Sequence, residues 1–298
     1  MNKRVIAVGF FDGIHKGHKA LMDKAVSISK EKNIKSAVFT FKKHPDEVVF
    51  NKIVPLITTD NDRESTIKKY GNVSEVFFWD FDKTNSAIPW DTFTKDILFN
   101  RLNASHIVTG EDFKFGYKGL GNSDNLSELC KSYGIGYDAI SKVLVDDTRV
   151  SSTHIRSLIS SGNIENANRF LSHPYEISGT VIHGRKLGRT IGVPTINVKM
   201  PLDIARLPNG VYITLVTVDG ITHKATTNIG VIPTFLDTNE VFIEANILDF
   251  AGDLYGKTVT ISFFKFIRPE KKFDNIDTLK EEILKNINET RNYGGFKW

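Results

Sequence analysis

Two histidines and three glycines near the start of the chain have the types and spacing of a phosphate-handling turn. The string GFFDGIHKGH occupies residues 9–18, and its glycines allow tight turns and a close approach of the backbone to a ligand. His15 and His18 are three residues apart at the expected start of a helix, which puts both imidazoles on one face. Free N–H groups at a helix start and two imidazole donors can stabilise charge that develops on a phosphate during transfer. A metal-binding pair and a pair of solvated histidines are the alternatives.

Two further segments have phosphate-binding chemistry. Residues 150–156 read VSSTHIR, in which Ser152 or Thr153 suits a helix cap and Arg156 offers a guanidinium fork for phosphate oxygens. Residues 183–197 read HGRKLGRTIGVPTIN, a glycine-containing basic loop that is a plausible phosphate cradle. Taken alone, the first segment favours only a helix cap, and the second is also compatible with a solvated basic loop.

The first half of the chain alternates strand and helix patterns. Short apolar runs predict buried strands at residues 5–11, 37–41, 76–79, 106–109 and 139–143, and helical spacing predicts helices at 18–32, 90–102 and 125–133. This alternation predicts crossover units and a mostly parallel sheet with flanking helices, and the string at 9–18 resembles an ATP-handling turn of the nucleotidylyltransferase type. Ligands of such sheets bind beyond the carboxyl ends of the strands, where the string at 9–18 is placed.

The second half has the pattern of antiparallel strands. Runs rich in β-branched and aromatic residues occur at 177–183, 195–200, 211–218, 222–229, 242–250 and 259–267. Asp219-Gly220 between two of them is a hairpin signal. We expect a small closed barrel of about six strands, followed by a helix at 277–290. Short helices at 152–161 and 165–172 precede His173-Pro174, so the domain division is expected between 1–173 and 174–298.

Composition limits the class of protein. The 298 residues carry a net charge of +4, which is too balanced to indicate a nucleic-acid partner. The one cysteine, Cys130, excludes an intramolecular disulfide and fits a reducing compartment. We find no apolar stretch near the roughly 20 residues of a membrane span. The expected location is cytoplasmic, with no membrane partner.

The motifs, taken in order, resemble the bifunctional riboflavin kinase/FAD synthetase family. The matching segments are 9–18, 110–116, 150–156, 194–197, 207–212, 228–235, Glu244 and 248–250, so the resemblance spans nearly the whole chain. It implies that riboflavin, FMN and ATP are the small-molecule partners and that Mg²⁺ accompanies ATP. Departures from the family pattern occur at Phe10, Gly119, His154 and Asn246.

Residue chemistry and the resemblance together assign the site residues. The expected catalytic residues are His15, His18, Arg156 and Glu244, and the resemblance implies that Glu244 is the general base toward the ribityl 5′-hydroxyl. The ATP-binding residues are Gly9, Phe10, Phe11, Asp12, Gly13, Gly17, Ser152, Thr153, Gly184, Arg185, Lys186, Gly188 and Arg189. The resemblance implies that flavin is bound by Asp112, Phe113, Phe115, Gly210, Tyr212 and Arg268, and that Mg²⁺ is held by Thr195 and Asn197.

The main hypothesis is a bifunctional enzyme that makes FMN in the second domain and FAD in the first. One alternative is a riboflavin kinase with an impaired first domain, which the departures at Phe10 and Gly119 motivate. The other is a flavin- or nucleotide-binding regulator without turnover.

Overall fold

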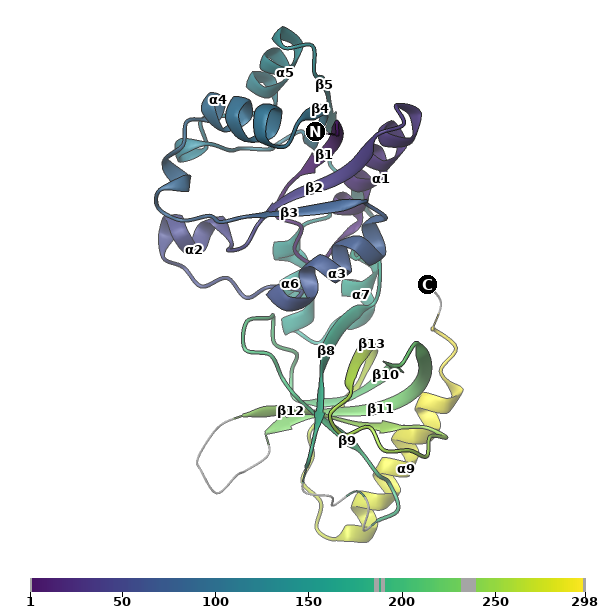
Figure 1. The fold of residues 1–298 in the computed structure, drawn as a ribbon. Coiled ribbons are helices and arrows are strands. Elements are labelled where there is room, and N and C mark those ends of the chain that lie inside the picture. The colour runs from purple at the N-terminus through teal and green to yellow at the C-terminus, as the bar shows by residue number, and fades with distance from the viewer. Residues whose placement is uncertain (1, 185–187, 189–190, 232–239, 297–298) are drawn as a thin grey trace. The chain divides into compact units, whose positions relative to one another are not determined.

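The computed structural model describes residues 2–184, 188, 191–231 and 240–296, and the chain forms two compact units, Met1–Ser152 and Thr153–Trp298. The first unit contains a parallel sheet with flanking helices, and the second contains a closed antiparallel barrel with a terminal helix (Figure 1). Both architectures confirm the sequence prediction. No helix among the described residues combines the length and apolar character needed to cross a bilayer.

The sheet of the first unit places two of the predicted motifs at one position. Its strand order is β3-β2-β1-β4-β5, and all neighbouring strands are parallel. The strands are β1 (Arg4–Val8), β2 (Lys35–Phe41), β3 (Glu75–Trp79), β4 (Ala104–Gly110) and β5 (Gly136–Ile140). The chain order reverses between β1 and β4, and such a switch point opens a ligand crevice at the carboxyl ends of the strands. The segments 9–18 and 110–116 follow these two strands directly.

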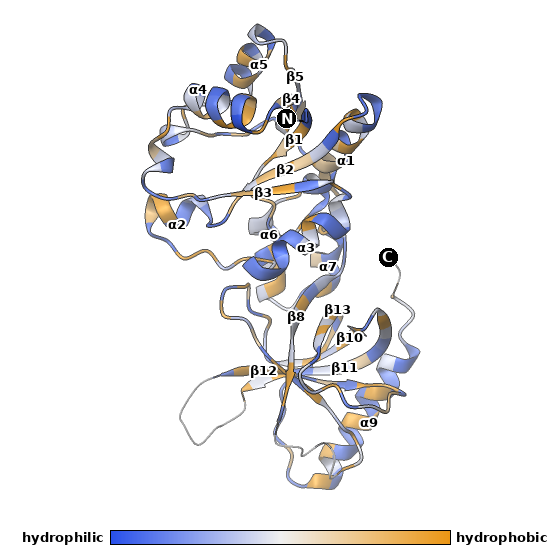
Figure 2. Ribbon diagram, viewed as in Figure 1, coloured by the Kyte–Doolittle hydropathy of each residue, from blue (hydrophilic) through white to orange (hydrophobic). Residues whose placement is uncertain are grey.

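Helical segments cover both faces of this sheet. They are α1 (Lys16–Glu31), α2 (Pro45–Phe50), α3 (Asp60–Gly71), α4 (Trp90–Thr92), the π-helical η2 (Phe93–Arg101) and α5 (Ser123–Ser132). Successive side chains of a strand point to opposite faces. Accordingly, Val5 belongs to the core that includes Met22 of α1, whereas Ile6 belongs to the core that includes Leu98 of η2. Burial on both faces explains why the inner strands β1 and β2 read as nearly continuous apolar runs, parts of which are coloured toward hydrophobic in Figure 2.

Two predicted strands of the first unit differ by three residues from their bounds in the structure. β1 ends at Val8 rather than residue 11, because Phe11, Gly13 and Ile14 have positive φ angles of 54°, 77° and 38° and turn the chain out of the sheet. β5 lies at Gly136–Ile140 rather than 139–143. The residues that follow form a hairpin, β6 (Leu144–Val145) and β7 (Thr148–Arg149), which the sequence analysis did not predict.

The second unit is a six-stranded antiparallel barrel in the order β10-β11-β12-β9-β8-β13, closed by the pairing of β13 with β10. Its strands are β8 (Tyr175–Ile182), β9 (Ile196–Lys199), β10 (Gly210–Val218), β11 (Ile221–Val231), β12 (Val241–Ile247) and β13 (Thr258–Pro269). Asp219 and Gly220 have φ angles of 50° and 80° in the predicted hairpin turn. The terminal helix α9 (Ile276–Asn292) carries both hydrophobic and hydrophilic residues (Figure 2).

Two short helices, α6 (Ser152–Ser160) and α7 (Ile164–Phe170), connect the sheet to the barrel. The compact units divide after Ser152, earlier than the division expected after residue 173. The reason lies in Asn168 of α7, whose side chain donates to the Phe263 carbonyl at 2.8 Å and accepts from the Tyr175 N–H at 2.8 Å. These bonds attach α7 to β13 and β8.

Candidate active sites

The His15–His18 pair lies at the start of α1, beyond the carboxyl end of β1. His15 is the N-cap residue, and its Nδ1 accepts a hydrogen bond from the His18 N–H at 3.0 Å. A neutral His15 therefore carries its proton on Nε2. The two rings are stacked with their centroids 3.6 Å apart, so both imidazoles lie together as predicted.

His18 is in an environment that disfavours a positive charge. Burial, and then the charge of His15, lower the pKa of His18 well below its ordinary value. Its Nδ1 is buried and has no hydrogen-bond partner among the described residues. An imidazole nitrogen that is buried but unpaired is costly unless a ligand pairs with it. A bound phosphate group would supply a hydrogen-bond partner for this nitrogen, and its negative charge would favour the protonated ring.

A cavity of about 230 Å³ adjoins this pair. It is lined by Gly9, Phe11, His15, Gly17, His18, Gly110, Asp112, Phe113, Arg149 and Ser152, among others. The structure thus brings together residues from three predicted motifs. Arg149 was missed by the sequence analysis and forms an ion pair with Asp112. No motif marked it, because it belongs to the unpredicted hairpin.

Four expected site residues of the first unit do not line this cavity. The Asp12 carboxylate is buried and accepts from the N–H groups of Ile57 and Thr58, at 2.7 and 3.2 Å, so it holds the loop in place. Gly13 packs against Ile57, with no space for a side chain. Phe115 belongs to the buried core, where Phe113 stacks on it.

Phe10, the fourth of these residues, packs elsewhere than predicted. Its ring contacts the edge of His44, and the guanidinium of the buried Arg63 lies 4.6 Å from its centroid. Arg63 Nη2 donates to the carbonyls of Phe41 and Lys42 at the end of β2. The departure from the family pattern at Phe10 therefore does not obstruct the cavity beside the histidines.

α6 begins with residues of the third motif. Ser152 Oγ donates to the carbonyl of Asp12 at 3.1 Å and so connects this motif with the first one. Thr153 and Arg156 continue the same helix in the second unit, where Arg156 Nη2 donates to Thr153 Oγ1 at 3.2 Å.

The barrel has a cavity of about 720 Å³ between its strands and α9. Its polar lining includes Thr195, Asn197, Thr226, Asn228, Glu244, Asn246, Arg268 and Asn286. Its apolar lining includes Val211, Val231, Phe273, Ile276, Leu279, Ile283 and Ile287. Leu279, Ile283 and Ile287 share one face of α9 at helical spacing, and this apolar face serves as one wall of the cavity. A site with one apolar side and several polar groups suits a ligand of the same character.

Three predicted residues line the same cavity, where β12 pairs with β9. Glu244 of β12 pairs directly with Asn197 of β9, and Thr195 lies two residues before Asn197. The Oδ1 atom of Asn197 is buried without a hydrogen-bond partner among the described residues. An unpaired amide oxygen beside a hydroxyl and a carboxylate suits a hard cation such as Mg²⁺.

Two glycines of the basic loop are close to Asn197 and Thr195. A Cβ on Gly184 would lie 2.4 Å from Asn197 Nδ2, so this glycine leaves the space that the amide occupies. Gly188 lines the large cavity, and a Cβ there would lie 3.6 Å from Thr195 Oγ1. Arg185, Lys186 and Arg189 lie outside the described residues.

The predicted flavin contacts of the barrel divide into two groups. Arg268 lines the cavity, but its Nε is held by Glu282 at 3.2 Å and Asn286 at 3.1 Å on α9. Tyr212 is fully buried in the barrel, and its hydroxyl donates to the Pro208 carbonyl at 2.6 Å. Gly210 begins the same strand and packs against the Arg268 carbonyl. Neither Tyr212 nor Gly210 lines the cavity, whereas Val211 between them does, because successive side chains of a strand point to opposite faces.

A cavity of about 380 Å³ adjoins the other side of Thr195. It is lined by Val181, Pro194, Thr195, Ile196, Ala245, Ile247, Phe250, Ala251, Gly252, Asp253, Leu254 and Tyr255. Because Thr195 lines both barrel cavities, two ligands bound in them would approach each other at this residue.

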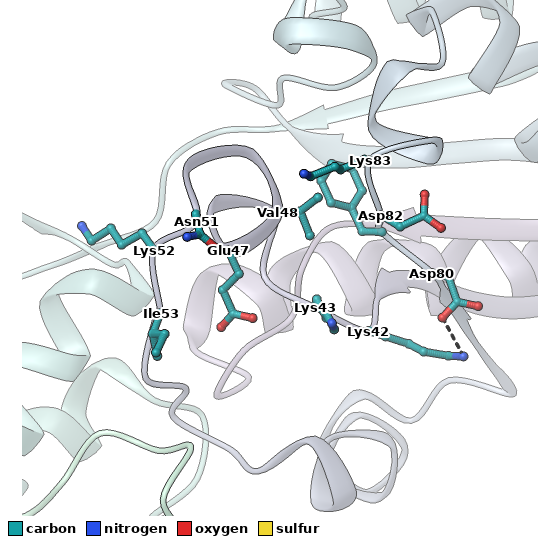
Figure 3. Close-up of a pocket in the computed structure, with 11 residues that line it drawn as sticks. Lys42, Lys43, Glu47, Val48, Asn51, Lys52, Ile53, Asp80, Asp82 and Lys83 are labelled. Atoms are coloured by element: carbon teal, nitrogen blue, oxygen red, sulfur yellow. Dashed lines mark ion pairs between the residues drawn. The ribbon is translucent and has the colours of Figure 1, made fainter.

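Figure 3 shows a separate cavity of about 600 Å³ in the first unit, beyond β2 and β3. Its charged residues are Lys42, Lys43, Lys52, Lys83, Glu47, Asp80 and Asp82, and Lys42 is paired with Asp80 at 2.8 Å. Four lysines and three carboxylates nearly balance in charge, and no predicted site residue lines this cavity.

Comparison with known proteins identifies the family. The family model described as FAD synthetase matches residues 1–154, and the one described as riboflavin kinase matches residues 171–294. A bifunctional riboflavin kinase/FMN adenylyltransferase of Listeria monocytogenes is 36% identical over 97% of this chain and 91% of its own length. The chain belongs to the bifunctional riboflavin kinase/FMN adenylyltransferase family.

Further relatives agree with this family assignment. The bifunctional riboflavin kinase/FMN adenylyltransferase of Bacillus subtilis is 35% identical, with 98% of this chain and 92% of that protein covered. A solved structure described as a macrolide-efflux protein from Streptococcus pneumoniae is 31% identical, with a TM-score of 0.87 over 98% of this chain and 95% of that one. The fold of the bifunctional family thus also occurs in a protein described by a different activity.

Proposed function

We propose that this enzyme makes FAD from riboflavin in two ATP-dependent steps. The second domain transfers the γ-phosphoryl group of ATP to the 5′-hydroxyl of riboflavin, which yields FMN and ADP. In the first domain, the FMN phosphate attacks the α-phosphorus of a second ATP, which yields FAD and pyrophosphate. The observation that carries the proposal is the pairing of Glu244 with Asn197 in an amphipathic barrel cavity, in a chain whose two parts match the two family models in order.

The presence of two adjoining barrel cavities supports the assignment of flavin to one and of nucleotide to the other. The larger one has the apolar wall that the tricyclic flavin ring needs, and its polar side suits the ribityl chain. We assign the adjoining cavity beyond Thr195 to ATP. The γ-phosphate and the 5′-hydroxyl then meet beside Glu244, which takes the proton of the attacking hydroxyl as general base.

Mg²⁺ belongs to this proposal, with Thr195 and Asn197 as its protein ligands. When bound, the cation would neutralise charge on the ATP phosphates. The unpaired Asn197 Oδ1 and the neighbouring Thr195 supply neutral oxygens, and the phosphates supply the remaining charged ligands.

In the first domain, His15 and His18 stabilise the charge that develops on the α-phosphate as pyrophosphate leaves. Asp112 and Phe113 are assigned to the flavin side of this cavity. The proposal assigns adenylylation to residues 1–173, so that Ser152, Thr153 and Arg156 of α6 serve this reaction and bind the ATP phosphates. Both reactions use ATP, and we place them in the cytoplasm.

An assay of both products tests the proposal. We expect purified protein supplied with riboflavin, ATP and Mg²⁺ to form FMN first and then FAD, and protein supplied with FMN to form FAD directly. Formation of FMN without FAD at saturating ATP would reduce the function to a riboflavin kinase. Flavin binding without release of ADP or pyrophosphate would instead indicate a regulator.

The substitution Gly184→Ala tests the position of Asn197. The added Cβ would lie 2.4–2.7 Å from the Asn197 amide group and displace it. We expect riboflavin phosphorylation to fall by about tenfold, as for the loss of one good interaction of roughly 1.4 kcal/mol. Steady-state rates of FMN formation measure this effect. Gly294→Ala, at a position without a positive φ and with nothing within 4 Å of the added Cβ, is the control and should retain phosphorylation. Equal rates for both variants would contradict the assignment of Asn197.

A further inference from the structure

Asn246 connects the strand of Glu244 to the segment that carries Thr195. It lies on β12 two residues beyond Glu244, so both side chains point to the same face of the strand. Its Nδ2 donates to the carbonyl of Pro194 at 2.7 Å, and the residue is 9% exposed. Both Asn246 and Thr195 line the larger barrel cavity.

This bond occurs where the strand ladder ends. β12 and β9 pair as Glu244 with Asn197 and Ala245 with Ile196, and the pairing goes no further. Asn246 would come opposite Thr195, beyond the last pair. Pro194 has no N–H and cannot donate to a strand ladder, so the backbone offers only its carbonyl at this point. The Asn246 side chain donates to that carbonyl, so β12 remains bonded to the residues before β9 although the backbone ladder has ended.

We infer that Asn246 is a positioning residue for the ATP side of the kinase site, and this inference rests on the proposed function. By holding the Pro194 carbonyl, it fixes the backbone that leads into Thr195 and keeps the Thr195 hydroxyl beside Asn197 and Glu244. Asn246 acts through Thr195, so it governs the use of ATP and Mg²⁺ rather than the affinity for flavin.

Three substitutions separate this role from a direct flavin contact. Asn246→Leu keeps the size of the side chain and removes the donor. Asn246→Asp keeps its shape and replaces the donor with an acceptor. Asn246→His retains a ring N–H that can donate.

We expect Asn246→Leu to raise the KM for ATP and the Mg²⁺ concentration at half-maximal rate by about tenfold, because a buried carbonyl loses its partner. Asn246→Asp should raise both at least as much, and Asn246→His should restore most of the wild-type response. The dissociation constant of riboflavin, from fluorescence quenching, should stay within about twofold. Conversion of FMN to FAD by the same protein is the internal control for folding and should not change.

The inference is overturned if Asn246→Leu and Asn246→Asp leave the ATP and Mg²⁺ responses unchanged, or if they weaken only riboflavin binding. If Asn246→Leu also loses FAD formation, the Asn246→Asp and Asn246→His pair decides. Titration calorimetry with ADP and Mg²⁺ measures nucleotide binding, to which the Thr195 segment contributes, without turnover. A wild type that forms no FMN, but whose ADP binding is weakened by Asn246→Leu, would reject the proposed function and leave the positioning role.

Discussion

Replacing Glu244 with glutamine should abolish the formation of FMN while the conversion of FMN to FAD continues. The substitution keeps the size and hydrogen-bonding shape of the side chain but removes the carboxylate that accepts the proton of the 5′-hydroxyl. Loss of a general base typically reduces a rate by about 10²–10⁴-fold. Separate assays, one with riboflavin and one with FMN, measure the two activities in the same preparation.

The matched control is Glu240→Gln, the same substitution just before β12. Glu240 forms an ion pair with Lys199 on the exterior, and it lines none of the cavities described above. Surface ion pairs contribute about 0–1 kcal/mol, so this variant should retain both activities. Unchanged FMN formation by Glu244→Gln would reject Glu244 as the base. Loss of both activities in a folded protein would reject two independent sites.

The substitution His18→Ala should have the opposite effect, with FAD formation lost and riboflavin phosphorylation retained. His18 lies at the switch point of the sheet with an unpaired buried nitrogen, and its pKa is lowered by burial and by His15. Bound phosphates would supply its missing partner and raise its pKa, because opposite charge favours the protonated ring. Removal of one preorganised donor typically reduces a rate by about 10²–10³-fold.

The control for this variant is His106→Ala. His106 lies near the amino end of β4 and pairs with Asp138 at 2.7 Å, away from the carboxyl ends where the candidate site lies. His106→Ala removes the same kind of side chain from the same compact unit, so losses due to folding alone should appear in both variants. If His106→Ala reduces FAD formation as much as His18→Ala does, the role assigned to His18 is not supported.

The sequence alone determined the two architectures and their order. Each depends on a local pattern: alternation of apolar strands with helices for the parallel sheet, and closely spaced β-branched runs for the barrel. The proximity of His15 to His18 was also predictable, since three residues at a helix start bring the rings together. The apolar face of the terminal helix could be read from its spacing, although not its role as a cavity wall.

Tertiary structure decided which residues of each motif face the cavities. The string at 9–18 reads as one unit, yet Asp12 bonds to residues 57–58 and Phe10 packs against Arg63. In the barrel, Tyr212 is likewise a residue of a matching motif that is buried and does not line the cavity. The directions of these side chains depend on the positive φ angles after β1 and on the closure of the barrel. The spacing of residue types predicts neither feature, because both depend on contacts between residues distant in the chain.

The link from Asn246 to Pro194 joins residues 52 positions apart, and Arg149 reaches Asp112 across 37 positions. Neither pair has a sequence signature, since each depends on where a strand ladder or a hairpin happens to end. The sequence by itself therefore determined the fold of each domain and the family motifs. The tertiary structure decided how those motifs are oriented and held, because side-chain direction depends on neighbours that are distant along the chain.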